Sequence, residues 1–313
     1  MRCRIHHPLK TLAFISRLED VSRPVPDQLY KPFWRIPHVL SLDVPLVAMA
    51  WLYIFTKTWR VDYHPWEAYL VLIIFSWIIS ITARWMDAML LVRRNQPLNA
   101  QDQFLLRYHP FLKWFAVLLF LLGAGITIAY MSLAIYGYLL VVGVLIGGFL
   151  GLTMMTDPES NEIPYLKNCL AGLSFACGTA IFAHVYLPAT NVYEMFATRE
   201  FLCFVVLVIL NITAIDLWKK SFNLTDEPSR VFSDMSLTLP LTLLAVAVVY
   251  FSIKDDVSAT RPFYYSILIS CAMLYAINRI HEKFSLETLS IMANAALLTP
   301  CIIYLAYIRT GLP

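Results

Sequence analysis

Residues 200–218 read Glu200-Phe-Leu-Cys-Phe-Val-Val-Leu-Val-Ile-Leu-Asn-Ile-Thr-Ala-Ile-Asp-Leu-Trp218, one apolar run that is long enough to cross a lipid bilayer. A helix rises about 1.5 Å per residue, so roughly 20 such residues span a hydrocarbon core of about 30 Å. The run contains one acid near its end, Asp216, and continues directly into Lys219 and Lys220. This pattern predicts a transmembrane helix that carries a carboxylate at the membrane boundary.

Further apolar runs of similar length occur throughout the 313-residue chain, in which 59% of residues are hydrophobic and 14% are charged. Soluble domains average about 25% charged residues. We therefore predict an all-α polytopic membrane protein with about nine transmembrane helices in a single domain. The predicted spans are 37–56, 66–86, 111–131, 133–154, 165–186, 200–218, 231–251, 262–280 and 288–308.

The first 36 residues form a polar arm ahead of the predicted domain at 37–313. Leu and Ile recur at three-residue intervals between residues 8 and 21, with Lys10 and Arg17 between them, which favours a helix lying in the membrane interface. A solvated arm without regular structure is the alternative. The arm lacks the apolar core and cleavage site of a signal peptide, so we expect the first span to be an uncleaved anchor.

Basic residues predict the orientation, because Lys and Arg accumulate in cytoplasmic loops. Most of the 24 Lys and Arg residues lie on the side of the N-terminal arm. The six on the opposite side are Lys57, Arg60, Arg199, Lys254, Arg261 and Arg309. This bias predicts a cytoplasmic N-terminus. It also explains the net charge of +3, which therefore does not indicate a nucleic-acid partner.

Several smaller features carry structural expectations. The six cysteines include no CxxC pair, so neither a disulfide framework nor a thiolate metal site is expected. Gly143, Gly147 and Gly151 recur at four-residue spacing and predict close approach of a neighbouring helix. Pro240 and Pro300 lie inside predicted spans and should kink them. The sequence shows no half-helix break of the type found in transporters.

Two acids lie at the ends of even-numbered spans and therefore on the same side of the membrane. They are Asp87, after the second span, and Asp216, in the sixth. A carboxylate at that depth is costly and is a functional candidate. The structural alternative is an ion pair, with Arg84 for Asp87 and with Lys219 or Lys220 for Asp216. Asp43, in the first span, either pairs with Arg84 or His38 or lines a cavity.

Several short motifs occur in a fixed order along residues 33–305. They are Arg35-Ile-Pro-His38, Ser41-Leu-Asp-Val44, Ala83-Arg-Trp-Met-Asp-Ala88, the loop 156–167, Lys167-Asn168 with Gly172, Phe175 and Gly178, and Leu297-Leu-Thr-Pro300. Each motif is weak alone, but in this order they resemble the UbiA superfamily of intramembrane prenyltransferases, and in particular a divergent bacterial branch of it.

The resemblance implies nine helices around a central cavity that opens to the cytoplasm, in the bacterial inner membrane. It also implies that Asp87 and Asp216 bind Mg²⁺ on the diphosphate of a prenyl donor and act in catalysis. Arg84, Lys167, Lys220, Asp43, Asn168 and Asn211 become candidate substrate-binding residues. Trp77, Trp85, Tyr165 and Trp218 are candidates for stabilising an allylic cation through their π faces.

The family motifs are incomplete in this chain. Asn-x-x-x-Asp-x-x-x-Asp corresponds to Ile79, Ala83 and Asp87, and Asp-x-x-x-Asp corresponds to Asp216 and Lys220, or to Ile212 and Asp216. One carboxylate therefore remains in each motif. Mg²⁺ needs only one or two protein carboxylates beside a substrate phosphate, and Lys220 could place its charge directly on a phosphate.

Two classes of function follow from this mixture of retained and lost ligands. The first is a UbiA-like transferase that moves a prenyl group from a prenyl diphosphate to an unidentified acceptor, with impaired activity. The second is an inactive protein of the same fold that acts as a membrane scaffold, a subunit or a lipid-binding protein.

Overall fold

The computed structural model describes residues 36–93, 98, 100–155, 164–188, 191–222, 227–255 and 260–310. The predicted interfacial helix at 8–21 and the connection at 156–163 lie outside these residues. The described helices are α2 (Ile36–Val39), α3 (Asp43–Thr58), α4 (Trp66–Arg93), α5 (Ala100–Tyr130), α6 (Ile135–Met155), α7 (Tyr165–His184), α8 (Val192–Ala197), α9 (Arg199–Ser221), α10 (Glu227–Lys254), α11 (Arg261–Ile280), the 3-10 helix η3 (His281–Lys283) and α12 (Leu286–Thr310).

Every regular element in the described part of the chain is a helix, which confirms the predicted all-α class. Eight of these helices, α4 to α7 and α9 to α12, are long and apolar enough to cross a membrane. The chain is therefore an integral membrane protein. Helices suit this environment because each backbone amide bonds within its own segment, where lipid offers no partner.

The first predicted span, 37–56, is wrong as a continuous helix. It is broken into α2 and the 16-residue α3 by a turn at Leu40–Leu42, in which Ser41 has a φ of 55°. The cause is Pro45, in the first turn of α3. A proline ring clashes with the carbonyl four residues earlier, here that of Ser41, and offers it no N–H. The helix therefore restarts at Asp43.

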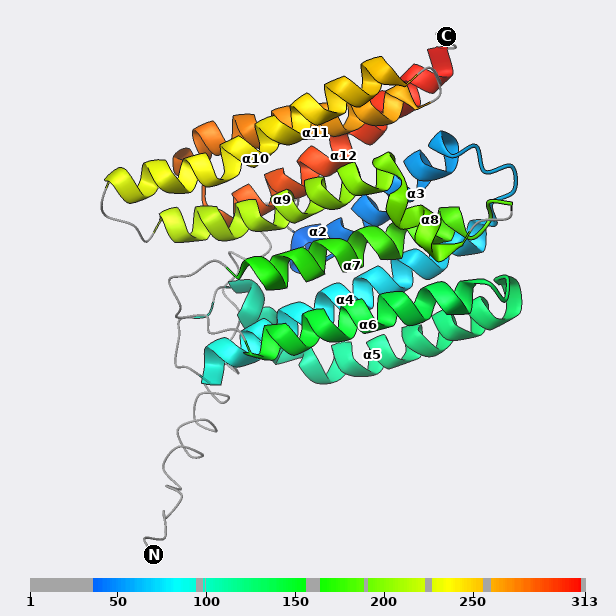
Figure 1. The fold of residues 1–313 in the computed structure, drawn as a ribbon. Helices are drawn as coiled ribbons and strands as arrows, with labels where there is room; N and C mark the ends of the chain where they lie inside the picture. Colours follow the sequence, from blue (N-terminus) through cyan, green and yellow to red (C-terminus); the bar gives the residue numbers. More distant parts are fainter. Residues whose placement is uncertain are drawn as a thin grey trace, which may run out of the picture.

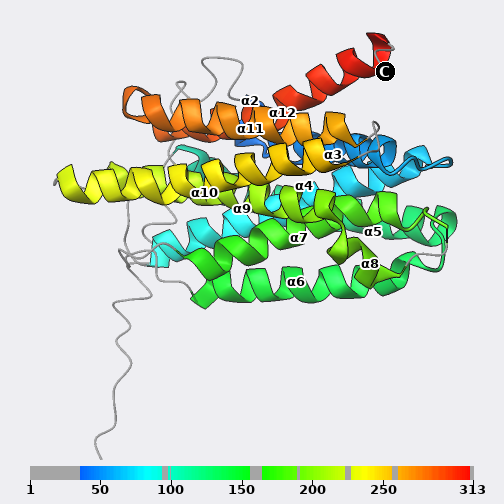
Figure 2. The ribbon, with the colours of Figure 1, turned by 45° about the horizontal axis from the view of Figure 1, so that its top comes forward.

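The long helices run side by side (Figure 1). In this view α10, α11 and α12 lie on one side of α9, while α4, α5 and α6 lie beyond α7 on the other side. In the turned view α11 lies beyond α10, and α6 lies on the far side of α7 (Figure 2). α3 packs against α4, α7 and α12, and α9 packs against α7, α10 and α12. The helices α3, α7 and α9 thus connect the two sides of the bundle.

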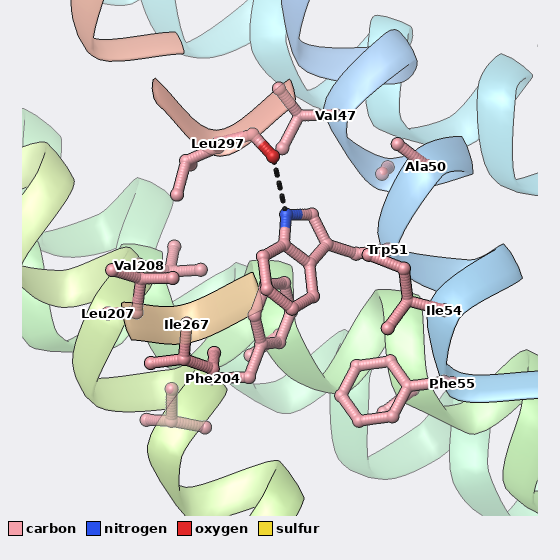
Figure 3. Packing of buried hydrophobic residues seen from close by; sticks show 14 of the residues in the cluster. Val47, Ala50, Trp51, Ile54, Phe55, Phe204, Leu207, Val208, Ile267 and Leu297 are labelled. Atoms are coloured by element: carbon pink, nitrogen blue, oxygen red, sulfur yellow. Dashed lines mark hydrogen bonds between the residues drawn. The ribbon is translucent and has the colours of Figure 1, made fainter. Parts of the chain in front are cut away.

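Trp51 anchors the short helix α3 in the middle of this bundle. Its side chain is fully buried, and its indole Nε1–H donates to the carbonyl of Leu297 on α12 at 3.0 Å (Figure 3). Its ring also lies 4.5 Å from that of Phe204 on α9 and 5.8 Å from that of Phe263 on α11, measured between centroids. One side chain therefore fixes α3 to three other helices.

Close helix packing occurs at a glycine outside the predicted stripe. Nothing lies within 4 Å of the positions that a Cβ would take at Gly143, Gly147 or Gly151, so the predicted close contact there is wrong. All three are exposed on α6. A Cβ at Gly172 on α7, in contrast, would lie 2.5 Å from Cγ1 of Ile209 on α9. This close approach requires glycine and fixes the spacing of α7 and α9.

Candidate functional site

A cavity of about 1260 Å³ lies inside the bundle, between α3, α4, α5, α6, α7, α9 and α12. Much of its wall is apolar and includes Val47, Leu72, Phe75, Leu139, Val142, Phe175, Phe182 and Val208. Its charged residues are Arg84, Asp87, Asp102, Lys167, Asp216, Lys219 and Lys220. They come from the end of α4, the starts of α5 and α7 and the end of α9, and we call this part of the cavity the charged end.

Asp87 sits at the charged end on α4, which continues seven residues past the predicted span to Arg93. Lys167 on α7 donates from Nζ to Asp87 Oδ1 at 3.0 Å. The Asp87 side chain is 49% exposed, while that of Lys167 is 18% exposed. The partner of Asp87 is therefore Lys167 and not Arg84, the partner that we expected if the acid had only a structural role.

Asp216 faces the same cavity from α9. Its Oδ2 accepts a hydrogen bond of 2.8 Å from Nδ2 of Asn168, which is buried on α7. Asn168 and Gly172 are one helical turn apart, so the contact between Gly172 and Ile209 brings this amide within reach of the acid. Lys219 and Lys220 line the cavity without a hydrogen bond or ion pair to Asp216 among the described residues.

Lys167 connects the two acids. It forms the ion pair with Asp87 and is also close enough to Asp216 for a favourable electrostatic interaction. Asp87 and Asp216 repel each other across the charged end. With Arg84, Lys219 and Lys220 nearby, four basic side chains line the cavity beside three acidic ones, Asp87, Asp102 and Asp216. Arg84 is compensated by Asp43, which lies 3.9 Å away outside the lining, so the charged end brings both signs of charge together around Asp87 and Asp216.

Both incomplete motifs face the cavity along their full length. Ile79, Ala83 and Asp87 on α4 line it, as do Ile212, Asp216 and Lys220 on α9. Residues four apart lie on the same face of a helix, and the cavity lies against that face in both helices. The positions that the resemblance aligns with the Asn and Asp residues of the UbiA motifs therefore lie next to the cavity, although Ile, Ala and Lys occupy some of them here.

The side chains at the charged end could supply only part of the ligands that a metal ion needs. Among the described residues, no group of three or more His, Cys, Asp or Glu side chains is arranged to hold a metal ion. Asp87 and Asp216 each keep one carboxylate oxygen without a hydrogen bond to the described residues. Such oxygens are the ligands that Mg²⁺ prefers, with waters and phosphate oxygens completing an octahedron. The residues fit Mg²⁺ only together with a phosphate ligand.

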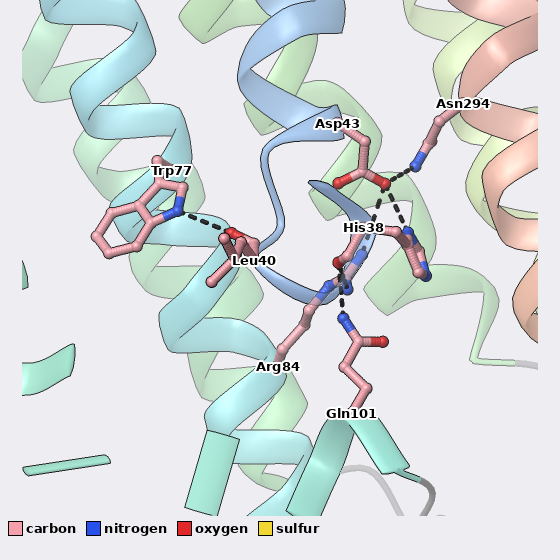
Figure 4. A network of polar contacts seen from close by, with 7 residues as sticks. All are labelled: His38, Leu40, Asp43, Trp77, Arg84, Gln101 and Asn294. Carbon is pink, nitrogen blue, oxygen red and sulfur yellow. Dashed lines mark hydrogen bonds and ion pairs between the residues drawn. The ribbon is translucent and has the colours of Figure 1, made fainter. Parts of the chain in front are cut away.

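A second polar cluster lies beside the break between α2 and α3 (Figure 4). His38 Nδ1 is 2.8 Å from Oδ2 of Asp43, and the same oxygen accepts a hydrogen bond from Nδ2 of Asn294 on α12. Arg84 Nη2 lies 3.9 Å from this carboxylate. Asp43 is therefore an ion-paired acid, as the structural alternative predicts, and it is not one of the residues that line the cavity.

The carbonyl groups freed by the break are satisfied from neighbouring helices. The carbonyl of His38 accepts from Nη1 of Arg84 at 3.2 Å and from Nε2 of Gln101 at 2.9 Å, and the carbonyl of Leu40 accepts from the indole of Trp77 at 2.9 Å. Sequence reasoning missed Gln101 and Asn294. The only sequence signal for these two residues was an amide side chain at the start of an apolar helix or within one. Such an amide is equally typical of a helix–helix hydrogen bond.

The four aromatic residues predicted at the cavity are placed elsewhere. Trp77 donates to the carbonyl of Leu40 at the break, and Trp218 donates to Asn278. Trp85 stacks on His109, and Tyr165 is half exposed. None of the four lines the cavity. Each is offset around its helix from the positions that face inwards. The aromatic side chains in the wall are Phe75, Phe120, Phe149, Phe175 and Phe182.

Asn211 lines the cavity from α9, one turn before Ile215, and is almost fully buried. Its Oδ1 is buried without a hydrogen-bond partner among the described residues. The predicted candidates Arg84, Lys167, Asn168, Asn211 and Lys220 are thus brought to one cavity together with both acids.

Comparisons of the chain with protein-family models, with curated proteins and with solved structures found no match.

Proposed function

We propose that the chain binds a prenyl diphosphate and transfers its prenyl group to an acceptor, in the manner of the UbiA superfamily that its motifs resemble. The proposal rests mainly on one observation. Asp87 and Asp216 line one cavity, together with Lys167, Lys219 and Lys220, and the rest of the cavity wall is largely apolar. An isoprenoid diphosphate has the matching anionic head and long apolar tail. The bacterial inner membrane, with the charged end towards the cytoplasm, is part of the proposal.

The diphosphate head would lie between α4, α7 and α9. Lys167, Lys220 and Arg84 supply positive charge for its oxygens, and the tail occupies the apolar part of the cavity. Asp87 and Asp216 would hold Mg²⁺ through their unbonded oxygens, and the ion would supply further neutralisation of the leaving diphosphate. The Phe rings in the wall, Phe75 and Phe175 among them, present π faces that stabilise an allylic cation.

The experiment uses the full chain in nanodiscs and a thiodiphosphate analogue of farnesyl diphosphate, which binds without ionising readily. With Mg²⁺ present, we expect Asp87→Asn and Asp216→Asn each to weaken binding by about tenfold or more, because a metal ligand is lost. Without Mg²⁺, the same changes should strengthen binding, because a charge that repels the phosphate is removed. Binding is measured by isothermal titration or by radiolabelled analogue.

The matched control is Asp255→Asn, an acid after α10 that accepts from Thr260 at the opposite end of the bundle. It should leave binding unchanged under both conditions. Identical binding by wild type, Asp87→Asn and Asp216→Asn, with and without Mg²⁺, would exclude the metal role.

A second candidate function is a non-catalytic lipid-phosphate-binding protein, favoured by the ion pair between Lys167 and Asp87, which occupies one oxygen of the only acid in the first motif. This protein would bind the thiodiphosphate analogue equally with or without Mg²⁺. It would also release no diphosphate from farnesyl diphosphate itself. Measuring both quantities in one preparation separates the two functions.

A further inference from the structure

Two residues that line the cavity also lie at the exposed surface of the bundle. They are Phe120 on α5, which is 49% exposed, and Gly143 on α6, which is exposed too. We propose that the cavity opens to the bilayer between them and that a long isoprenoid tail leaves through this opening, which we call the slot. The inference rests on the proposed function and deepens it, since it assigns the class of donor: diphosphates whose tails are longer than the cavity.

The slot lies between two consecutive helices that hardly touch. A short turn at residues 131–134 joins α5 to α6. Among the described residues, α5 packs against α4, and α6 packs against α7 and α4, whereas α5 and α6 make very few contacts with each other. The ring of Phe120 packs on that of Phe75 on α4, with 5.7 Å between centroids. The two helices therefore do not close this side of the cavity by packing together.

Gly143 leaves the α6 side of the slot without a side chain. The face of α6 that lines the cavity carries Val142, Ile146, Phe149 and Thr153. Gly143 lies at the edge of that face, and nothing is within 4 Å of the position that its Cβ would take. A larger residue there would extend into open space at the edge of the cavity. The absence of a side chain at this position therefore keeps the slot open.

The slot faces hydrocarbon and not water. In the most apolar stretch of each span, 11% of the α5 residues and 17% of the α6 residues are buried, the two lowest shares among the eight spans. Phe120 lies about 15 Å from the end of α5 at Tyr130, and Gly143 about 12 Å from the start of α6 at Ile135. Both residues are therefore well inside a hydrocarbon core of about 30 Å. A chain that emerges there remains among lipid tails.

The depth of the cavity limits the length of tail that it can enclose. On α4 the lining extends from Leu91 at the charged end to Leu72 at the far end, and Asp87 lies about 22 Å from Leu72 along the helix axis. A farnesyl chain is shorter than this depth, whereas a solanesyl chain, with three times as many isoprene units, is longer. Through the slot, the remaining units continue into the bilayer and stay out of water, so a longer tail carries no hydrophobic penalty.

The first test compares farnesyl and solanesyl thiodiphosphates as ligands of the full chain in nanodiscs. Concentrations are expressed per mole of lipid, because both analogues partition into the bilayer. Wild type should bind the two analogues with similar affinity. Gly143→Phe places a ring in the slot and should weaken binding of the solanesyl analogue by about tenfold or more, because a filled position in a packed wall excludes the chain. The farnesyl analogue should bind this variant as it binds wild type.

Gly147→Phe is the matched control. Gly147 lies one turn further along α6, is exposed and has open space around its Cβ position, but it does not line the cavity. The substitution should leave the affinities of both analogues unchanged. Equal weakening of both analogues by folded Gly143→Phe would show that the ring fills the cavity itself, and this result would overturn the slot. Unchanged solanesyl binding by folded Gly143→Phe, or a strong preference of wild type for the farnesyl analogue, would overturn it as well.

The second test uses no diphosphate, so its result does not depend on the proposed donor site. The nanodiscs contain phosphatidylcholine with a diazirine at the end of one acyl chain, and mass spectrometry locates the cross-links formed on irradiation. Val47 on α3 and Val208 on α9 are buried but line the cavity, so an acyl chain reaches them only from inside it. Leu118 on α5 is 62% exposed, does not line the cavity and serves as the internal control for labelling from the bilayer.

We expect cross-links to Val47 and Val208 in wild type and in Gly147→Phe, and at least about tenfold fewer in Gly143→Phe, where the ring fills the slot. Leu118 should be cross-linked equally in all three proteins. Absence of cross-links to Val47 and Val208 in wild type, or equal cross-linking in Gly143→Phe, would overturn the slot even if both analogues bind. Failure of wild type to bind either analogue would instead overturn the donor site, and the cross-links would still decide whether the slot admits a chain.

Discussion

Lys167 contributes to the electrostatics of the charged end through both acids, because it pairs with Asp87 and also interacts favourably with Asp216. Its ammonium group is bound to Asp87, so a phosphate would have to compete with that carboxylate for it. If the proposed function holds, a metal ion on Asp87 would release Lys167 for the phosphate. The ion pair would then couple metal binding to anion binding.

Ala83 is the residue whose replacement best tests descent from a metal-dependent enzyme. It lines the cavity one turn before Asp87, so Ala83→Asp places a second carboxylate on the same face of α4. We expect Mg²⁺-dependent binding of the thiodiphosphate analogue to improve by about tenfold, equivalent to about 1.4 kcal/mol. Titration of the analogue in the presence of Mg²⁺ measures this change.

The neutral variant Ala83→Asn has nearly the same shape as Ala83→Asp and provides the control, because it should not improve binding. If folded Ala83→Asp binds no better than wild type, the second candidate function, a non-catalytic lipid-phosphate-binding protein, gains support.

At the scale of helices, the spacing of α7 and α9 is set at Gly172, which has no side chain to hold the two helices apart. Gly172→Ala places a methyl group 2.5 Å from Cγ1 of Ile209 and 3.0 Å from its backbone N and Cα. Backbone atoms cannot move aside cheaply, so we expect a loss of about 1–3 kcal/mol in stability. The loss should appear as a lower midpoint in thermal or denaturant unfolding of the protein in detergent.

Gly178→Ala is the matched substitution on the same helix, because no atom lies within 4 Å of its added Cβ. There the helix should gain up to about 1 kcal/mol, since alanine favours helix over glycine. A similar effect of both substitutions, in either direction, would contradict the close approach at Gly172.

Helix positions could be predicted from hydropathy because every span needs about 20 predominantly apolar residues to cross the lipid core. The predicted span 165–186 corresponds to α7 and 262–280 to α11 within two residues. The break before Asp43 was missed because the apolar run continues through it, and only the clash between Pro45 and the carbonyl of Ser41 reveals it. Periodicity alone also placed the close helix contact on the wrong glycines.

The candidate site could be predicted only in part, because the sequence identifies unusual residues but not which of them meet. Acids inside apolar runs are rare enough to identify, so Asp87 and Asp216 could be selected without a structure. Their partners could not, because Lys167 and Asn168 are 80 and 48 residues away and only helix packing brings them together. Aromatic residues carry still less information, since all sides of a membrane helix accept them, and Trp85 and Trp218 were wrongly placed at the cavity.

For the whole molecule, the distribution of basic residues predicts that the charged end faces the cytoplasm. Cysteines introduced as Gln103→Cys, near the start of α5, and Tyr63→Cys, between α3 and α4, lie at opposite ends of the bundle. A membrane-impermeant maleimide should label Tyr63→Cys in intact cells and Gln103→Cys only after permeabilisation. The unsubstituted protein controls for native cysteines, and the reverse labelling pattern would invert the proposed topology.

The brevity of α3 has a consequence for where polar groups lie in the membrane. Its 16 residues extend about 24 Å, which is less than the roughly 30 Å hydrocarbon thickness of an average bilayer. Most of α3 is buried among neighbouring helices, so the missing length is filled by the break and the side chains around it, and not by lipid. The dipoles and charges at His38 and Asp43 would therefore lie at a depth where a full-length span would present only hydrocarbon.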